Sequence, residues 1–312
     1  DSSWEPLVLP HDWSVQFPIA QENPSAGAGG YFKNGLGWYR KIFQVPEELE
    51  NKKISIHFGG VYMNAEVFVN GRSVGIQPYG YSPFYFDISE YLKFGEQNVI
   101  TVKVDNSEEI NSRWFSGSGI YRHVKIQVNN PLHFETNGVA INASEVDKNK
   151  ASVHISPAII NETKTIQEYR VTASVETEEE TFKSELALKN APGEIRKGTL
   201  ALELLNPRLW SPANPNLYTL KLAIKNAEGK TVDEVEETFG IRTIDYNSKD
   251  GFVLNGKSVL INGGNMHHDN GALGAAAFDR AEIRKVQLLK DAGFNSVRTS
   301  HNVPSEIFLK AC

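Results

Sequence analysis

The sequence predicts a mainly β protein: two β-sandwiches followed by the first β-α-β unit of a parallel sheet. Three observations predict this order. Short alternating runs with turn signals fill the first two thirds of the chain, the composition shifts after Asn129-Asn130-Pro131, and the first clear helical pattern begins only at Asp279. We expect domains at residues 1–129, 130–242 and 243–312, the last of them incomplete.

The first segment is predicted to be a sandwich of short strands. Runs at 54–58, 65–69, 98–104 and 123–128 are apolar or alternate at period two. Asn70-Gly71 supplies a type I′ turn, so a hairpin is expected over residues 65–75. Six aromatic residues are expected to fill its core: Trp38, Tyr39, Phe58, Phe68, Phe84 and Phe86.

The second segment is predicted to be another sandwich. Strands are expected at 169–175, 199–205 and 217–224, and about 110 residues is the size of an immunoglobulin-like domain. The acidic run Glu176 to Glu180 is expected to be a solvated face or a loop tip and not a binding tail.

The third segment begins with a hairpin around Asn255-Gly256. It leads into a strand near 260–264, a helix from Asp279 to Ala292 and a strand at 294–299, with Asp279 as the N-cap. Strand, helix and strand with a short return form one β-α-β unit of a parallel sheet.

A single β-α-β unit cannot bury both faces of a parallel sheet. We therefore expect this chain to be the front of a longer protein, with another helix beginning near Ser305. Exposed apolar strand edges after residue 251 are expected either to pair with another copy, which would give a homo-oligomer, or to be poorly ordered.

The charge balance excludes several function classes. Thirty-two Lys and Arg residues stand against 38 Asp and Glu residues, so the net charge is −6. A net negative charge does not indicate the basic surface that binding to nucleic acid or to an anionic membrane requires. No apolar run approaches the roughly 20 residues that span a bilayer. Cys312 is the only cysteine, which excludes a disulfide framework and a zinc site built on several thiolates.

Polar residues follow both strands of the predicted parallel pair. Asn265, His267 and His268 come at the end of the first strand, and Arg298 and His301 at the end of the second. The carboxyl ends of parallel strands face the ligand site in α/β folds. Imidazoles and an amide suit a hydroxyl-rich ligand, and an arginine can orient a carboxylate. The alternative is a set of hydrogen-bonded structural groups.

A metal site is a competing interpretation, with His267, His268, Asp269 and His301 as ligands. Adjacent side chains on an extended segment point in opposite directions, so His267 and His268 do not readily share one metal. Gly117-Ser118-Gly119 lacks the strand-to-helix context of a phosphate-binding loop.

Several motifs, in order along the chain, resemble the N-terminal part of glycoside hydrolase family 2, the group of β-galactosidases, β-glucuronidases and β-mannosidases. Residues 293–305 are similar to the family's N-x-x-R-x-S-H signature, and residues 260–267 to its G-x-N-x-H segment. Other segments resemble parts of its first two domains: 37–40, 67–71, 116–122, 209–212 and 239–242.

The resemblance implies a jelly-roll sugar-binding-like domain, an immunoglobulin-like domain and a TIM barrel that carries the active site. It also implies retaining hydrolysis by two glutamates about 5–5.5 Å apart, one an acid/base and one a nucleophile. In the family both glutamates lie on later barrel strands, beyond residue 312. The 312 residues alone are therefore expected to be inactive.

The resemblance also assigns roles to the predicted rim, which includes Asn265. His267 and His301 would hydrogen-bond sugar hydroxyls, and Arg298 would orient the nucleophilic glutamate and favour its ionised form. Loops of the first domain reach the pocket in related enzymes. This implies sugar contacts by four more residues: Asp12, Ser112, Arg113 and Trp114.

Departures from the family pattern leave the sugar open. Ser112 stands where a sugar-binding acid is often found, Met266 replaces an arginine, and His268 replaces an acid. β-Galactosidase is the first choice, with β-glucuronidase or β-mannosidase as alternatives and a non-catalytic carbohydrate-binding module as the rival class. No cofactor is expected, although a divalent or sodium ion stays open for the full-length enzyme.

The expected partner is a carbohydrate substrate, with neither nucleic acid nor membrane. Asp1-Ser2-Ser3 shows no signal peptide but is compatible with a processed start. Together with the family's use in polysaccharide degradation, this favours a periplasmic or secreted location.

Overall fold

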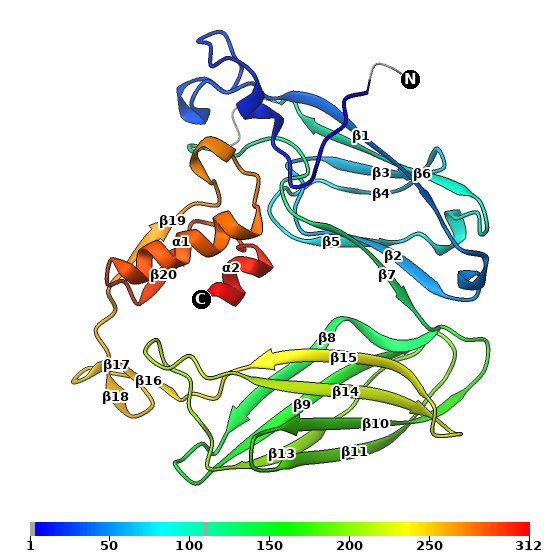
Figure 1. Ribbon diagram of the computed structural model, residues 1–312, viewed down its shortest axis with the longest axis vertical. Helices are drawn as coiled ribbons and strands as arrows, with labels where there is room; N and C mark the ends of the chain where they lie inside the picture. Colours follow the sequence, from blue (N-terminus) through cyan, green and yellow to red (C-terminus); the bar gives the residue numbers. More distant parts are fainter. Residues whose placement is uncertain (1–3, 109–111) are drawn as a thin grey trace. The chain divides into compact units, whose positions relative to one another are not determined.

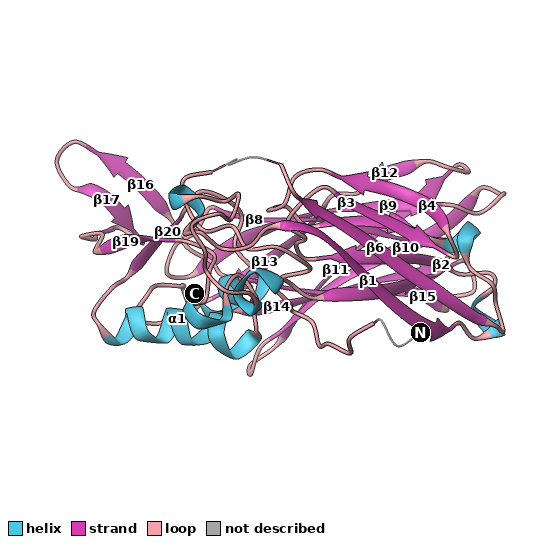
Figure 2. Cartoon of the chain, turned by 90° about the horizontal axis from the view of Figure 1, so that it is seen from above, coloured by secondary structure: helices cyan, strands magenta, loops and turns pink. Residues whose placement is uncertain are grey.

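The computed structural model describes residues 4–108 and 112–312 of the chain. It divides into two compact units, residues 1–128 with 262–312, and residues 129–261. Strands dominate both units (Figure 2), so the predicted mainly β class is confirmed. The domain boundaries at 129/130 and 242/243 stay predictions. Among the described residues, no helix has the length and apolar character needed to cross a membrane.

The first unit contains a two-sheet sandwich with strand orders β1-β6-β3-β4 and β5-β2-β7. Its strands are β1 (Gly35–Gln44), β2 (Lys53–Phe58), β3 (Ala65–Val69), β4 (Arg72–Gln77), β5 (Phe84–Asp87), β6 (Gln97–Asn106) and β7 (Val124–Asn129). Short 3₁₀ turns lie between them: η1 (Trp13–Gln16), η2 (Gly27–Gly29), η3 (Glu47–Leu49) and η4 (Ser89–Tyr91). The β3–β4 hairpin turns at Asn70-Gly71, as predicted.

The predicted aromatic core of this sandwich is only partly correct. Tyr39 and Phe58 are buried, but Trp38 is 47% exposed and packs beside Phe68, which is half-buried. Successive side chains of a strand point to opposite faces, so Trp38 and Tyr39 cannot both enter the core. Aliphatic residues on alternate positions of β2, β3 and β6 fill it instead: Ile54, Ile56, Val67, Val69, Val102 and Val104.

The second unit is also a sandwich. One sheet has the order β11-β10-β14-β15, and the other has the order β12-β9-β13, with β8 paired to β9. Its strands are β8 (Leu132–Ser144), β9 (Lys150–Asn161), β10 (Gln167–Glu176), β11 (Thr181–Asn190), β12 (Ile195–Lys197), β13 (Leu200–Leu205), β14 (Tyr218–Asn226) and β15 (Thr231–Phe239).

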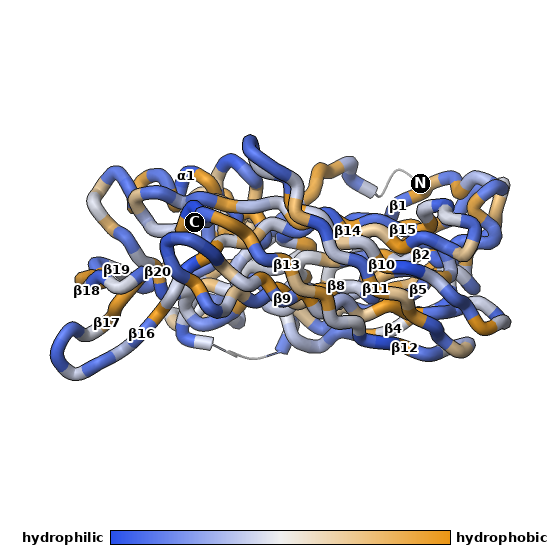
Figure 3. Tube along the Cα trace, turned by 90° about the horizontal axis from the view of Figure 1, so that it is seen from below, coloured by the Kyte–Doolittle hydropathy of each residue, from blue (hydrophilic) through white to orange (hydrophobic). Residues whose placement is uncertain are grey.

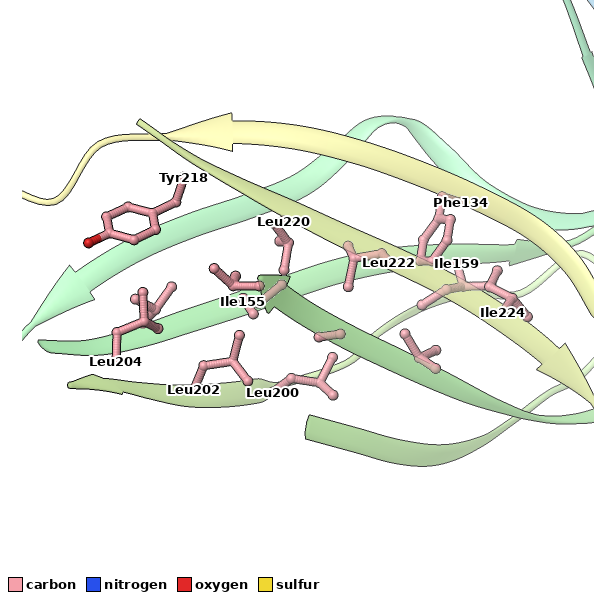
Figure 4. Packing of buried hydrophobic residues seen from close by; sticks show 14 of the residues in the cluster. Phe134, Ile155, Ile159, Leu200, Leu202, Leu204, Tyr218, Leu220, Leu222 and Ile224 are labelled. Carbon is pink, nitrogen blue, oxygen red and sulfur yellow. The ribbon is translucent and has the colours of Figure 1, made fainter. Parts of the chain in front are cut away.

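Side chains from β9, β13 and β14 fill the space between these sheets (Figure 4). Apolar and polar residues follow one another along the strands, as the orange and blue of the tube show (Figure 3). The acidic run lies between β10 and β11, where Thr177 N–H donates to the Glu180 carbonyl. It is therefore a loop tip, as predicted.

A small antiparallel sheet follows, made of β16 (Ile244–Asn247), β17 (Gly251–Leu254) and β18 (Lys257–Ser258). The turn between β17 and β18 uses Asn255 and Gly256, with φ of 52° and 74°. Both lie in the left-handed region that a type I′ turn requires, which is why an Asn-Gly pair predicted this hairpin.

The last segment forms the predicted β-α-β unit. β19 (Gly263–Met266) and β20 (Ser296–Thr299) are parallel, and α1 (Asp279–Asp291) connects them (Figure 1). The 3₁₀ turn η5 (Gly271–Leu273) precedes α1, and α2 (Glu306–Ala311) follows β20. The Ser305 side chain caps α2 by accepting the Phe308 N–H.

The predicted N-cap of α1 is wrong. Asp279 is the first helical residue and Phe278 holds the cap position, with no side-chain cap hydrogen bond. The Asp279 carboxylate lies 2.5 Å from His123 Nε2 in the sandwich of the same unit. Asp279 therefore lies in the first turn of α1, one position after the predicted N-cap, and pairs with a residue outside the helix.

Candidate active site

The parallel pairing of β19 and β20 brings two of the predicted rim residues together. Asn265 lies opposite Arg298 in the register of the two strands. Arg298 Nη1 donates to Asn265 Oδ1 at 3.3 Å and to Ser300 Oγ at 3.4 Å. Both side chains are exposed. The guanidinium is therefore held in place while part of it stays open to an anionic partner.

An aromatic cluster lies at the ends of the same two strands. The rings of His267 and His301 are 5.8 Å apart, and Trp114 packs against both, at 5.5 Å and 5.3 Å between centroids. Trp114 Nε1 donates to Tyr81 Oη at 3.0 Å, which fixes the indole. Three of the predicted residues thus meet, two from the β-α-β unit and one from the sandwich loop.

His268 faces a different environment from His267. Its Nε2 lies 3.0 Å from the Ser116 carbonyl, so this nitrogen donates, and its ring packs edge-on against Tyr81 and Tyr121. Burial lowers the pKa of His268, which favours the neutral imidazole. The two neighbouring histidines therefore have different surroundings. His267 belongs to the Trp114 cluster, whereas His268 packs behind it against Tyr81 and Tyr121.

No group of three or more His, Cys, Asp or Glu side chains is placed to hold a metal ion within residues 4–108 and 112–312. A cavity of about 20 Å³ lies behind the histidines, lined by Arg122, His268, Glu282 and Lys285 among others. That volume holds about one water molecule and not a sugar ring. A sugar would have to approach the open side of the Trp114 cluster.

The other predicted residues of the first domain take different positions. Asp12 is buried, and its carboxylate accepts three backbone N–H groups. The Ser112 hydroxyl donates to the Trp114 carbonyl at 3.2 Å, inside its own loop. Arg113 is exposed beside Trp114. Sugar contacts by Asp12, Ser112 and Arg113 stay predictions.

Two buried charged residues behind the cluster were not among the predicted site residues. Arg122 Nη2 donates to the Val303 carbonyl at 2.8 Å and Nη1 to the Gly59 carbonyl at 3.2 Å, so it supports the loop after His301. Glu282 on α1 accepts hydrogen bonds from Lys285, Ser305 and Asn270. Arg122 belongs to the recognised segment 116–122 and could have been singled out there.

The environment of Glu282 decides its charge. Burial alone would raise the pKa of its carboxyl, but the hydrogen bonds from Lys285, Ser305 and Asn270 outweigh burial and lower the pKa. The carboxylate is therefore ionised and paired at neutral pH. It ties α1 to the start of α2 and to the loop after the histidines. The i,i+3 spacing to Lys285 is visible in the sequence, but the other two partners, Asn270 and Ser305, are 12 and 23 positions away and no simple pattern signals them.

Three domain models of one family match the chain. They are the sugar binding domain of glycosyl hydrolases family 2 at residues 2–131, the domain described as glycosyl hydrolases family 2 at 133–242, and its TIM barrel domain at 247–312.

Individual relatives agree with these matches. Beta-galactosidase BoGH2A of Bacteroides ovatus is 42% identical over 317 residues, which cover 100% of this chain and 37% of that protein. A putative beta-glucuronidase of Formosa agariphila is 39% identical over 313 residues, covering 100% of this chain and 29% of that protein.

Solved structures give the same result. A glycosyl hydrolase family 2 member from Bacteroides cellulosilyticus superposes with a TM-score of 0.96 at 42% identity, covering 100% of this chain and 41% of that one. A beta-glycosidase from Bacteroides vulgatus has a TM-score of 0.91 at 38% identity, with 100% and 40% covered. The chain spans less than half the length of the relatives it matches.

Proposed function

The chain belongs to glycosyl hydrolases family 2, and on that premise we propose that it is the N-terminal part of a retaining β-glycosidase. The proposed reaction is hydrolysis of terminal β-galactosides. The similarity to the beta-galactosidase of Bacteroides ovatus, over the whole of this chain, supports the choice of sugar.

The observation that carries the proposal is the Trp114 cluster beside the Asn265–Arg298 pair. In the proposed complex, His267 and His301 donate N–H groups to sugar hydroxyls. The indole of Trp114 supplies an apolar face, because a pyranose ring presents C–H groups as well as hydroxyls. Hydrogen bonds of this kind strengthen as the ring approaches an oxocarbenium-like transition state.

Arg298 has a separate role in the proposal. Its guanidinium lies at the strand end and is exposed, so it can hold the nucleophilic carboxylate of the whole enzyme. A nearby positive charge lowers the pKa of a carboxyl group and keeps it ionised for attack on the anomeric carbon.

Two glutamates of the last segment are already committed to other partners. Glu282 is buried against Lys285, and Glu306 lies 2.7 Å from Lys310 and 3.1 Å from Lys125. We therefore propose that the acid/base and the nucleophile come from parts of the whole protein outside these 312 residues. On this proposal the 312-residue piece alone hydrolyses no glycoside.

β-Glucuronidase is the second candidate. The exposed Arg113 next to Trp114 could pair with the carboxylate of a uronic acid, and the Formosa agariphila relative is described as a putative beta-glucuronidase. A pure carbohydrate-binding module is a weaker alternative, because binding alone needs no arginine placed to orient a nucleophile.

The test uses the full-length protein that contains this chain and a panel of nitrophenyl β-glycosides. We expect turnover of the galactoside, a loss of about 100-fold or more in kcat/KM for His301→Ala, and no turnover by the 312-residue piece. His154→Ala is the matched control, since His154 is exposed on β9 and its Nε2 lies 2.8 Å from the Ser144 hydroxyl, outside the candidate site.

Each outcome discriminates between the candidates. Preference for the glucuronide, lost on Arg113→Ala, would replace galactosidase by glucuronidase. A full-length protein that binds sugars but hydrolyses none of the panel would move the assignment to a binding module.

A further inference from the structure

The carboxylate of Asp12 joins three segments that are far apart in the sequence. Its Oδ1 accepts the backbone N–H of Ser14 and of Ser118, both at 2.9 Å, and its Oδ2 accepts the N–H of Ala275 at 2.8 Å. The residue is only 3% exposed. Hydrogen bonds from N–H groups to an ionised carboxylate are among the stronger ones, so this buried charge is well compensated.

Two glycines leave room for this carboxylate. A Cβ added to Gly117 would lie 2.6 Å from Asp12 Oδ2, and a Cβ added to Gly274 would overlap the same oxygen. Both residues also have positive φ, 73° and 62°. The segments around residues 12, 117 and 274 are therefore matched to one another, although 263 positions separate Asp12 from Ala275.

These anchor points flank the residues of the candidate active site. Ser118 closes the loop that carries Trp114, and Ala275 follows the segment that carries His267. Two further hydrogen bonds connect the same segments. His268 Nε2 donates to the Ser116 carbonyl, and the Ala277 N–H donates to the Tyr121 carbonyl. Those two contacts join the segments directly, whereas the Asp12 carboxylate joins both of them to a third segment, residues 12–14.

We propose that Asp12 is a positioning residue that sets the Trp114 loop in register with the histidine-bearing segment. It does so through the Ser118 and Ala275 amides and not by touching the sugar. The inference rests on the proposed function, because it places Trp114 and His267 in a glycosidase site. It assigns the sandwich domain a direct part in shaping that site.

Asp12→Asn in the full-length protein tests the proposal. The amide keeps the size of the carboxyl but turns one acceptor oxygen into an N–H donor that faces a backbone N–H. We expect a loss in kcat/KM on the order of 100-fold, because displacement of a positioned group by about 1 Å can cost that much. Asp87→Asn is the control, since the Asp87 carboxylate accepts hydrogen bonds from Ser89 and Lys53 in the same domain, away from the candidate site.

A double-mutant cycle separates positioning from a general structural role. Trp114→Phe keeps an aromatic ring but removes the hydrogen bond to Tyr81. If Asp12 acts by placing Trp114, Asp12→Asn should cost less than about tenfold in the Trp114→Phe background, because the two effects overlap. Fully additive losses, or full activity of Asp12→Asn, would overturn the proposal.

Hydrogen exchange supplies a readout that does not depend on activity. The amides of Ser118 and Ala275 should exchange faster in Asp12→Asn than in the parent protein. Unchanged exchange would overturn the proposal that Asp12 positions these two segments. If the parent hydrolyses no glycoside, the proposed function fails. Hydrogen exchange alone then tests whether Asp12 holds the Ser118 and Ala275 amides. If Asp12→Asn does not fold, Gly274→Ala breaks the same contact from the other side and should reproduce the loss of activity.

Discussion

The sandwich of residues 129–261 and the joint behind the candidate active site are stabilised in different ways. The sandwich buries aliphatic side chains at alternate positions of its strands, such as Val153 and Ile155 of β9 and Leu220 and Leu222 of β14. The joint, which we define as Asp12, Arg122, His268, Glu282 and their contacts, places buried charged groups and a half-buried imidazole against specific partners.

The comparison predicts a difference in tolerance. Apolar contacts have no direction, so an aliphatic core accepts a side chain of similar volume with little loss. A buried ion or imidazole needs a particular partner at a particular atom, so even an isosteric change leaves a group unpaired. The joint supports the residues proposed to bind substrate, so a small displacement within it is expected to change substrate binding and turnover.

The largest expected effect is on the joint. Glu282→Gln preserves the shape of the side chain but leaves Lys285, 2.6 Å away and mostly buried, without its counter-charge. Removing one partner of a buried pair costs about 3–5 kcal/mol. Urea denaturation of the chain, followed by hydrogen exchange of α1 peptides, measures this loss. The control Glu306→Gln affects a solvent-exposed pair and should cost less than about 1 kcal/mol; equal losses in both variants would contradict the distinction.

A smaller effect is expected in the sandwich of residues 129–261. Leu222→Ala should lower its free energy of unfolding by about 2–5 kcal/mol, because a fully buried side chain leaves a cavity. Leu222→Met, which keeps the volume, should cost less than about 1.5 kcal/mol. Exchange of β14 peptides under urea gives both values. A methionine variant as unstable as the alanine variant would show that this core is no more tolerant than the joint.

The smallest effect is a dependence on pH. Burial lowers the pKa of His268, and also of His11 and His57 in the same unit. Below pH 6.5 these histidines bind protons more readily in the unfolded chain than in the folded one, so stability falls as pH decreases from 6.5 toward the folded-state pKa values.

For a single histidine the slope is at most about 1.4 kcal/mol per pH unit. Urea midpoints of the unit formed by residues 1–128 and 262–312, taken at pH 7.5 and 5.5, measure it. His268→Gln should reduce the difference between the two midpoints. A difference that is unchanged in this variant would remove His268 from the explanation.

Features that depend on neighbours along the chain could be predicted from the sequence. The turns at Asn70-Gly71 and Asn255-Gly256, the loop tip at the acidic run and the β-α-β unit all follow from local conformational preferences and periodicity. The strand-end rule also predicted that Asn265, His267, Arg298 and His301 lie at one edge, because parallel strands end at the same edge; the structure pairs Asn265 with Arg298 and His267 with His301.

The identity of the distant segments that meet could not be predicted in this way, because it depends on tertiary packing. The alternation of side chains along a strand predicts that Trp38 and Tyr39 face opposite sides of the sheet, but it does not predict which of them faces the core. Nothing near residue 12 indicates that its carboxylate would accept N–H groups from residues 106 and 263 positions away. Likewise, nothing near residue 279 indicates that its carboxylate would meet His123, which is 156 positions away. Local rules fix backbone conformation, whereas the pairing of buried polar groups depends on the packing of the whole unit.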